Sequence, residues 1–137
     1  LSDLKMLTEE KIGRIGTLKC EIPLVEFTHS VIELLGCNGL RYVDAGRPVH
    51  RVAVGGGACG CYIPQAVAAG CDTFVTSDIK YNQFWDAQDF GINLIDAGHF
   101  YTENPVCAVL ADTLRRAFPE LEVQISQKHR DCMKFFG

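Results

Sequence analysis

Long hydrophobic runs, runs of like charge and low-complexity tracts are all missing from these 137 residues. A membrane helix needs about 20 consecutive apolar residues, and the apolar stretch at residues 52–70 is broken by glycines and a proline. The formal net charge of -4 and the pI near 5.5 leave no broad positive surface for nucleic acid or anionic lipid. The composition therefore predicts a soluble protein that acts through neither membranes nor nucleic acid.

A disulfide framework is absent as well, although the chain holds seven cysteines. Their number is odd, and they are scattered along a chain with enough apolar residues to build a core. Cys59 and Cys61 form only a C-x-C pattern, without the spacer and second pair of a zinc knuckle. Free thiols in a reducing cytoplasm are therefore expected.

Several catalytic motifs are also missing. The chain has no G-x-S-x-G elbow and no cysteine in a recognised nucleophile context, which disfavours covalent catalysis by serine or cysteine. The glycine run at 55–60 matches neither the Walker A spacing nor G-x-G-x-x-G. It is either an anion-binding turn or a tight turn that lets backbone segments pack closely. His29, His50 and His129 lack an acidic or thiol partner at a recognised spacing and are expected to be structural.

The chain does contain a periodicity that alternates between strand-like and helix-like segments, which is typical of an α/β fold. We expect strands at 12–18, 39–44, 50–54, 72–76, 92–95 and 121–125, and helices at 23–35, 63–69, 80–90 and 105–117. Short connections predict one compact mixed sheet flanked by helices, with 121–125 as an edge strand. Residues 1–137 are predicted to be a single domain, with flexibility confined to the first ten and last six residues.

The segment INLIDAGHFYTE places His99 and Glu103 between a buried strand and a helix whose start is marked by Asn104 and Pro105. Strand ends are where α/β proteins concentrate their chemistry. An imidazole nitrogen and a carboxylate on one short loop can converge on a divalent ion such as zinc, manganese or iron. The same spacing also fits a surface histidine beside a glutamate that only favours the helix dipole.

A second candidate site follows the strand predicted at 72–76. Asp78, Lys80 and Tyr81 come directly after this strand, at the same edge of the predicted sheet. Asp78 could orient a metal ligand or hold a metal-bound water, and Lys80 or Tyr81 could contact an anionic group of a substrate. The alternative is that Ser77 or Asp78 only caps the next helix.

Four segments in this order, IGRIGTL, RVAVGGGACG, FVTSDIKYN and LIDAGHFYTE, resemble the NGG-interacting factor 3-like family, whose members are also called GTP cyclohydrolase I type 2 homologues. The resemblance covers nearly the whole chain and implies a dinuclear metal centre. It implies that a His-His pair and an aspartate come from an N-terminal half. The histidine and glutamate of a G-H-x-x-x-E motif, here Gly98, His99 and Glu103, come from the C-terminal half.

The resemblance also implies that this chain is the C-terminal half of a larger two-part α/β fold, and we expect from its start at Leu1 that the N-terminal half is not present here. That half is then a partner, and the metal site of this chain alone is incomplete. Further implied are two divalent metal ions per intact subunit and a ring-shaped homohexamer. Where the family pattern T-G-D-x-x-Y-H has a histidine, this chain has Asn82, which cannot shuttle a proton near neutral pH.

These expectations describe a metal-binding protein that acts as a metal-dependent hydrolase. Two bridged metals would activate water against a phosphate ester, a purine ring or a related C–N bond of a small-molecule substrate. His99 and Glu103 are the candidate metal ligands, and Asp78, Lys80 and Tyr81 are the candidate catalytic residues. The alternative is a non-catalytic metal-binding or protein-interaction module.

Overall fold

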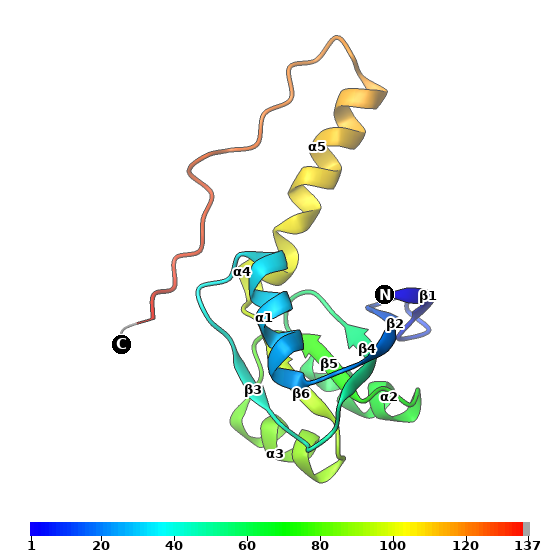
Figure 1. Cartoon of the computed structure of the whole chain (residues 1–137). Helices are drawn as coiled ribbons and strands as arrows, with labels where there is room; N and C mark the ends of the chain where they lie inside the picture. Colours follow the sequence, from blue (N-terminus) through cyan, green and yellow to red (C-terminus); the bar gives the residue numbers. More distant parts are fainter. Residues whose placement is uncertain (136–137) are drawn as a thin grey trace.

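The computed structural model describes residues 1–135, which fold around one six-stranded sheet (Figure 1). The strands lie in the order β1-β2-β4-β5-β6-β3. Along the chain the elements are β1 (Ser2–Met6), β2 (Arg14–Ile22), α1 (Leu24–Leu35), β3 (Arg41–Val43), β4 (Val49–Val54), the 3-10 turn η1 (Gly60–Tyr62), α2 (Ile63–Ala68), β5 (Thr73–Thr76), α3 (Tyr81–Asp89), β6 (Asn93–Asp96), α4 (His99–Glu103) and α5 (Pro105–Ala117). The predicted α/β class is confirmed.

The centre of the sheet is parallel and its edges are antiparallel. β4, β5 and β6 run parallel, and α2 and α3 lie in the connections between them. β2 and β1 extend the sheet antiparallel on one side, and β3 pairs antiparallel with β6 on the other. The mixed sheet predicted from the sequence is confirmed, including the helix predicted at 63–69 between the strands predicted at 50–54 and 72–76.

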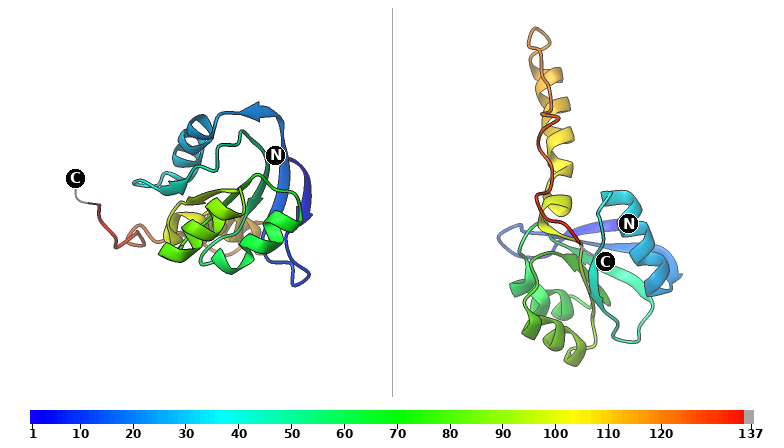
Figure 2. Two further views of the ribbon diagram at one scale, coloured as in Figure 1. Left: turned by 90° about the horizontal axis from the view of Figure 1, so that it is seen from below. Right: turned by 90° about the vertical axis from the view of Figure 1, so that its left-hand side faces the viewer.

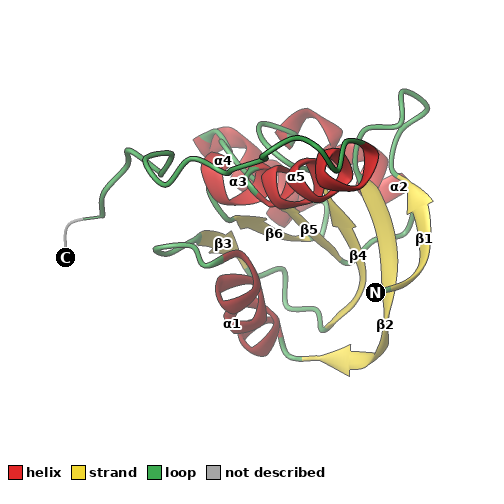
Figure 3. Cartoon of the chain, turned by 90° about the horizontal axis from the view of Figure 1, so that it is seen from above, coloured by secondary structure: helices red, strands yellow, loops and turns green. Residues whose placement is uncertain are grey.

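Successive side chains of the central strands point to opposite faces of the sheet, so each strand contributes to two cores. Phe74 and Leu94 pack in the core that includes residues of α2 and α3. Val75 and Ile95 belong to the core that includes the buried face of α1. Figure 3 shows α1 on one side of the sheet and α2 and α3 on the other. This layering covers both faces and leaves the carboxyl ends of the parallel strands as the place where functional loops can gather.

The helix boundaries follow local sequence chemistry. α1 ends at Leu35 and is capped by Gly36, which has a φ of 65° and whose N–H donates to the Ile32 carbonyl at 2.8 Å. α5 begins at Pro105, where the missing N–H removes no helical hydrogen bond. α3 begins after Lys80, whose backbone N–H donates to Gln83 Oε1 at 3.0 Å.

The two ends of the chain differ from the prediction. Residues 1–10 are predicted to be flexible, but Ser2–Met6 forms β1 and pairs with β2. Residues 121–125 are predicted to be an edge strand, but they form no strand, and no strand of the described sheet lies beside them. Of the last six residues, predicted to be flexible, 136 and 137 lie outside the described residues.

α5 projects away from the sheet, and the following chain returns beside it as an irregular tail (Figures 1 and 2). The helix has 13 residues, of which only Ala111 is buried. Neither α5 nor any other helix of residues 1–135 has the length and apolar character needed to cross a membrane.

Candidate functional site

Three loops meet at the carboxyl edge of the parallel strands. β4 runs into the glycine turn at 55–57, β5 into residues 77 and 78, and β6 into the start of α4. The Gly57 carbonyl accepts the Thr76 hydroxyl at 2.9 Å and the Ser77 N–H at 3.1 Å. The Ala97 N–H donates to the Thr76 carbonyl at 2.9 Å. These bonds hold the three loops together, so side chains far apart in the sequence become neighbours.

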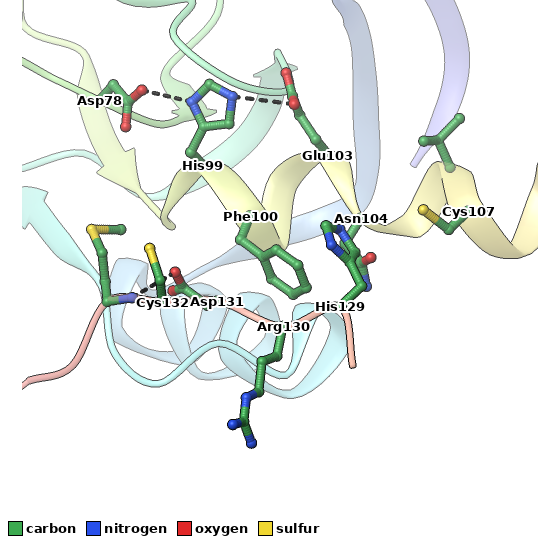
Figure 4. A pocket seen from close by; sticks show the side chains of 12 residues that line it. Asp78, His99, Phe100, Glu103, Asn104, Cys107, His129, Arg130, Asp131 and Cys132 are labelled. Atoms are coloured by element: carbon green, nitrogen blue, oxygen red, sulfur yellow. Dashed lines mark hydrogen bonds and ion pairs between the residues drawn. The ribbon is translucent and has the colours of Figure 1, made fainter. Parts of the chain in front are cut away.

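His99 lies between two carboxylates from this edge (Figure 4). Its Nδ1 is 2.6 Å from Asp78 Oδ2, and its Nε2 is 3.1 Å from Glu103 Oε2. His99 is the first residue of α4 and Glu103 is the last, so their spacing of four places both on one helix face. The structure thus joins residues that the sequence places in two separate candidate sites.

The two carboxylates determine the electrostatics of the imidazole. The hydrogen bond with Asp78 raises the pKa of His99 above its ordinary value, partial desolvation opposes the rise, and Glu103 adds to it. The side chains of Asp78, His99 and Glu103 are 46%, 46% and 55% exposed, so solvent screens these interactions. A cation is therefore favoured at His99, either as a proton on the ring or as a metal ion at Nε2.

Asp96 fixes the two loops that carry Asp78 and His99. This buried residue at the end of β6 accepts the Ile79 N–H through Oδ2 at 3.1 Å and the Gly98 N–H through Oδ1 at 3.2 Å. Arg41 on β3 donates to Oδ2 at 2.5 Å. Asp96 is not among the residues predicted from the sequence, although an acidic residue at the end of an apolar strand is a signal of such a buried hydrogen-bonding role.

The glycine run is a packing turn. Gly57 has a φ of 68°, and a Cβ built there would overlap the Glu103 carboxylate. A Cβ at Gly56 would lie 3.1 Å from the Thr102 carbonyl oxygen. The Gly57 N–H donates to the Thr102 hydroxyl at 3.0 Å, and the Gly55 N–H donates to the Val75 carbonyl at 2.9 Å. Because these amides are used inside the protein, the geometry favours close packing over an anion-binding turn.

Lys80 and Tyr81 lie apart from the cluster of Asp78, His99 and Glu103. Lys80 is exposed at the start of α3, and Tyr81 is 78% exposed and packs edge-on against Trp85. Asn82, at the position where the family pattern has histidine, is also exposed on α3. The alternative that Ser77 or Asp78 caps the next helix is wrong, because the N-cap of α3 is Lys80.

An open cavity of about 520 Å³ adjoins the cluster, and residues of the tail line its other side. Phe100 of α4 faces His129 of the tail, with ring centroids 5.0 Å apart. His129 is predicted from the sequence to be structural, and nothing in its spacing indicates that the tail returns to α4. The cavity gives the cluster access from solvent.

The donor set fits a metal ion in part. His99 Nε2 and the Glu103 carboxylate are suitable donors, and Asp78 contacts Nδ1 as the outer carboxylate of a metal-bound histidine commonly does. Among residues 1–135, however, no group of three or more His, Cys, Asp or Glu side chains is placed to hold a metal ion. A site built on His99 and Glu103 needs further donors from elsewhere.

The sequence and the fold place this chain in a known family. The Duf34/NIF3 (NGG1p interacting factor 3) family matches residues 1–132, so the chain belongs to it, as the sequence motifs predicted. A GTP cyclohydrolase 1 type 2 homolog of Bacillus subtilis is 43% identical over 93 residues, which make up 67% of this chain and 25% of that protein. A protein with the same name from Nostoc is 35% identical over 127 residues, which make up 90% of this chain and 48% of that protein.

Solved structures agree with this assignment. A Bacillus cereus protein related to NIF3 superposes with a TM-score of 0.76 at 32% identity, over 90% of this chain and 36% of that one. The Staphylococcus aureus protein SA1388 superposes with a TM-score of 0.78 at 26% identity, over 90% of this chain and 42% of that one. The chain thus spans less than half the length of each of these four relatives.

Proposed function

We propose that this chain is a metal-binding lobe that supplies His99 and Glu103 to a dinuclear centre completed by residues outside the chain. The observation that carries the proposal is the imidazole held between two carboxylates, with Asp78 on Nδ1 and Glu103 beside Nε2. A ring held in this way presents one nitrogen in a fixed direction next to a second donor. The absence of a third donor among residues 1–135 fits a site shared with another lobe.

The proposed activity is hydrolysis of a small molecule with a phosphate ester, a purine ring or a related C–N bond. Two divalent ions, of zinc, manganese or iron, would activate water and polarise the bond to be broken. With the Nδ1 proton donated to Asp78, the lone pair of Nε2 would be available to a metal ion that Glu103 also ligates. We propose that Lys80 and Tyr81, which are exposed at the start of α3, bind an anionic group of the substrate. The names of the Bacillus subtilis and Nostoc relatives agree with such chemistry.

A non-catalytic metal-binding or protein-interaction module is the second candidate. It is favoured by the exposed apolar residues of α5, which suit a contact with another protein. In either case we propose that the intact protein is cytoplasmic and forms the homohexamer that the family resemblance implies. Turnover separates the two candidates, because only the first requires a metal-dependent reaction.

Calorimetry with zinc and manganese tests the shared site. The 137-residue chain is expected to bind either ion much more weakly than the intact two-lobe protein, since two donors cannot replace a complete bridged set. Equal affinity and stoichiometry in both would contradict the proposal. A panel of nucleotides and phosphoesters, assayed with the intact protein before and after chelation, then decides between hydrolase and binding module.

A further inference from the structure

Arg41 lies at one edge of the sheet, close to the loops that carry Asp78 and His99. β3, which lies beside β6 in Figure 3, runs antiparallel to it, and Arg41 at the start of β3 pairs with Asp96 at the end of β6. The start of β3 therefore reaches the carboxyl edge of the parallel strands. The side chain of Arg41 is 61% exposed, so its position there depends on specific contacts rather than on burial.

One nitrogen of the Arg41 guanidinium group joins two partners. Nη2 donates to Asp96 Oδ2 at 2.5 Å and to the Ile79 carbonyl at 3.2 Å. The guanidinium carbon also lies 5.3 Å from the centroid of the Phe84 ring, within the range of a cation–π contact. Because a guanidinium group is planar and rigid, these three contacts fix its orientation as well as the place of its charge.

The contacts at Ile79 act on the backbone of Asp78. The Ile79 N–H belongs to the peptide group that follows Asp78, and it donates to Asp96 Oδ2 at 3.1 Å. Asp78 has a φ of 54°, a left-handed conformation that residues other than glycine seldom adopt and that persists where surrounding contacts hold it. In this conformation Asp78 Oδ2 lies 2.6 Å from His99 Nδ1. The pair of Arg41 and Asp96 thus holds both polar backbone groups of the residue that follows Asp78.

We propose that Arg41 is a positioning residue of the metal site. It keeps Asp78 in the conformation that reaches His99, and Asp78 in turn orients the imidazole toward a metal ion. The inference rests on the proposed function only in that His99 is taken to be a metal ligand. The competing explanation is that Arg41 only balances the charge of the buried Asp96, and this explanation requires no bond to the Ile79 carbonyl.

The tautomer of the neutral His99 ring reports this positioning without metal. At alkaline pH and with a chelator present, the 137-residue chain should carry the ring proton on Nδ1, because Asp78 is the nearer carboxylate. Glu103, 3.1 Å from Nε2, favours the other tautomer. Arg41→Met should release Asp78 and shift the ring toward the Nε2–H form, which the ring ¹⁵N chemical shifts measure. An unchanged tautomer in folded Arg41→Met overturns the inference.

Two control variants separate positioning from the loss of a surface charge and from the loss of stability. Arg47 is also exposed and donates from one guanidinium nitrogen to the Gly91 carbonyl at 3.2 Å, but at the amino edge of the parallel strands. Ile92→Val removes one buried carbon at that same edge and destabilises the fold without touching the loops of the site. Arg47→Met and Ile92→Val should both keep the wild-type tautomer of His99. A shift in either control as large as that in Arg41→Met overturns the inference.

Arg41→Lys decides between positioning and charge balance, and it keeps the test decisive if Arg41→Met does not fold. The ammonium group of lysine retains the charge beside Asp96, but it lacks the planar group that makes both bonds while lying over Phe84. We expect a folded chain that melts near the wild-type temperature and has its His99 tautomer shifted in the same direction as in Arg41→Met. A wild-type tautomer in Arg41→Lys would show that charge alone is sufficient and would overturn the inference.

Zinc titration of the intact two-lobe protein separates this inference from the proposed function. Loss of a group that orients a metal-bound histidine commonly weakens metal binding, so Arg41→Lys should lower the zinc affinity about tenfold or more. Arg47→Met should leave that affinity unchanged. A tautomer shift in a protein whose zinc binding does not depend on His99 would refute the metal site and leave the contact between Arg41 and the Asp78 loop standing. Zinc binding that is lost in His99→Ala but unchanged in Arg41→Lys would support the metal site and overturn the positioning role.

Discussion

At the scale of single residues, the site depends on buried polar groups whose partners come from distant loops. Asp96 joins Ile79 to Gly98, and Thr76 joins the glycine turn to β5. Asp78, His99 and Glu103 could be singled out from the sequence, because the ends of the apolar strands and the short loops that follow them can be recognised in it. Their mutual contacts could not be predicted, since they depend on strand order and on the left-handed backbone of Asp78, with a φ of 54°.

Ser77 and Thr76 are adjacent buried hydroxyls with opposite environments. Ser77 Oγ has no hydrogen-bond partner among residues 1–135, whereas Thr76 Oγ1 donates to the Gly57 carbonyl and accepts from the Cys59 N–H. Ser77→Ala should therefore raise the free energy of unfolding by up to about 1 kcal/mol, and Thr76→Val should lower it by about 1–3 kcal/mol. Urea unfolding measures both changes. Equal destabilisation by the two substitutions would contradict these hydrogen-bond assignments.

The pH dependence of His99 follows from its contact with Asp78. Because the folded pKa of His99 is raised, its stabilising contribution is fully present below the unfolded pKa of about 6.5 and is lost as pH rises through the folded pKa. Asp78→Asn should lower the pKa of His99 measured by NMR titration. It should also make the free energy of unfolding less dependent on pH between the unfolded and folded pKa values of His99. Asp86→Asn, on the exposed side of α3, is the control and should change neither. An unchanged His99 pKa in Asp78→Asn would refute the contact.

At the scale of elements, the glycine turn and α4 fit together closely. Gly57 and Gly46 both have positive φ, but a Cβ at Gly57 meets Glu103 and His99, whereas one at Gly46 meets no atom within 4 Å. The strands and helices of the sheet could be predicted because their apolar periodicity is local. This contact could not, since it joins residues 46 positions apart in the sequence.

Alanine substitutions at these two glycines test that fit. Each should cost about 1 kcal/mol of stability through the left-handed backbone, but only Gly57→Ala should push Glu103 away from His99. The His99 ring signals in NMR should then shift in Gly57→Ala and stay in place in Gly46→Ala. Identical ring signals in both variants would show that the turn does not position Glu103.

At the scale of the whole molecule, the errors of prediction have one physical origin. β1 has few apolar residues and forms because β2 offers it a partner. Residues 121–125 have strand periodicity, but no strand of residues 1–135 pairs with them. Strand formation depends on pairing as well as on pattern, and a single sequence reports only the pattern. The chain is a folded α/β body from which α5, the tail and the half-exposed side chains of His99 and Glu103 face outward.

The central claim is that His99 and Glu103 ligate one metal centre in the intact two-lobe protein. Its most direct test is the metal content of purified His99→Ala, Glu103→Ala and the double variant, measured alongside thermal melts. We predict that each single substitution removes most of the bound metal, that the double variant is scarcely worse, and that folding survives, because contributions within one site are not additive. Unchanged metal occupancy in both single variants would contradict the claim and leave Glu103 with only a helix-dipole effect of about 0.3–1 kcal/mol at most.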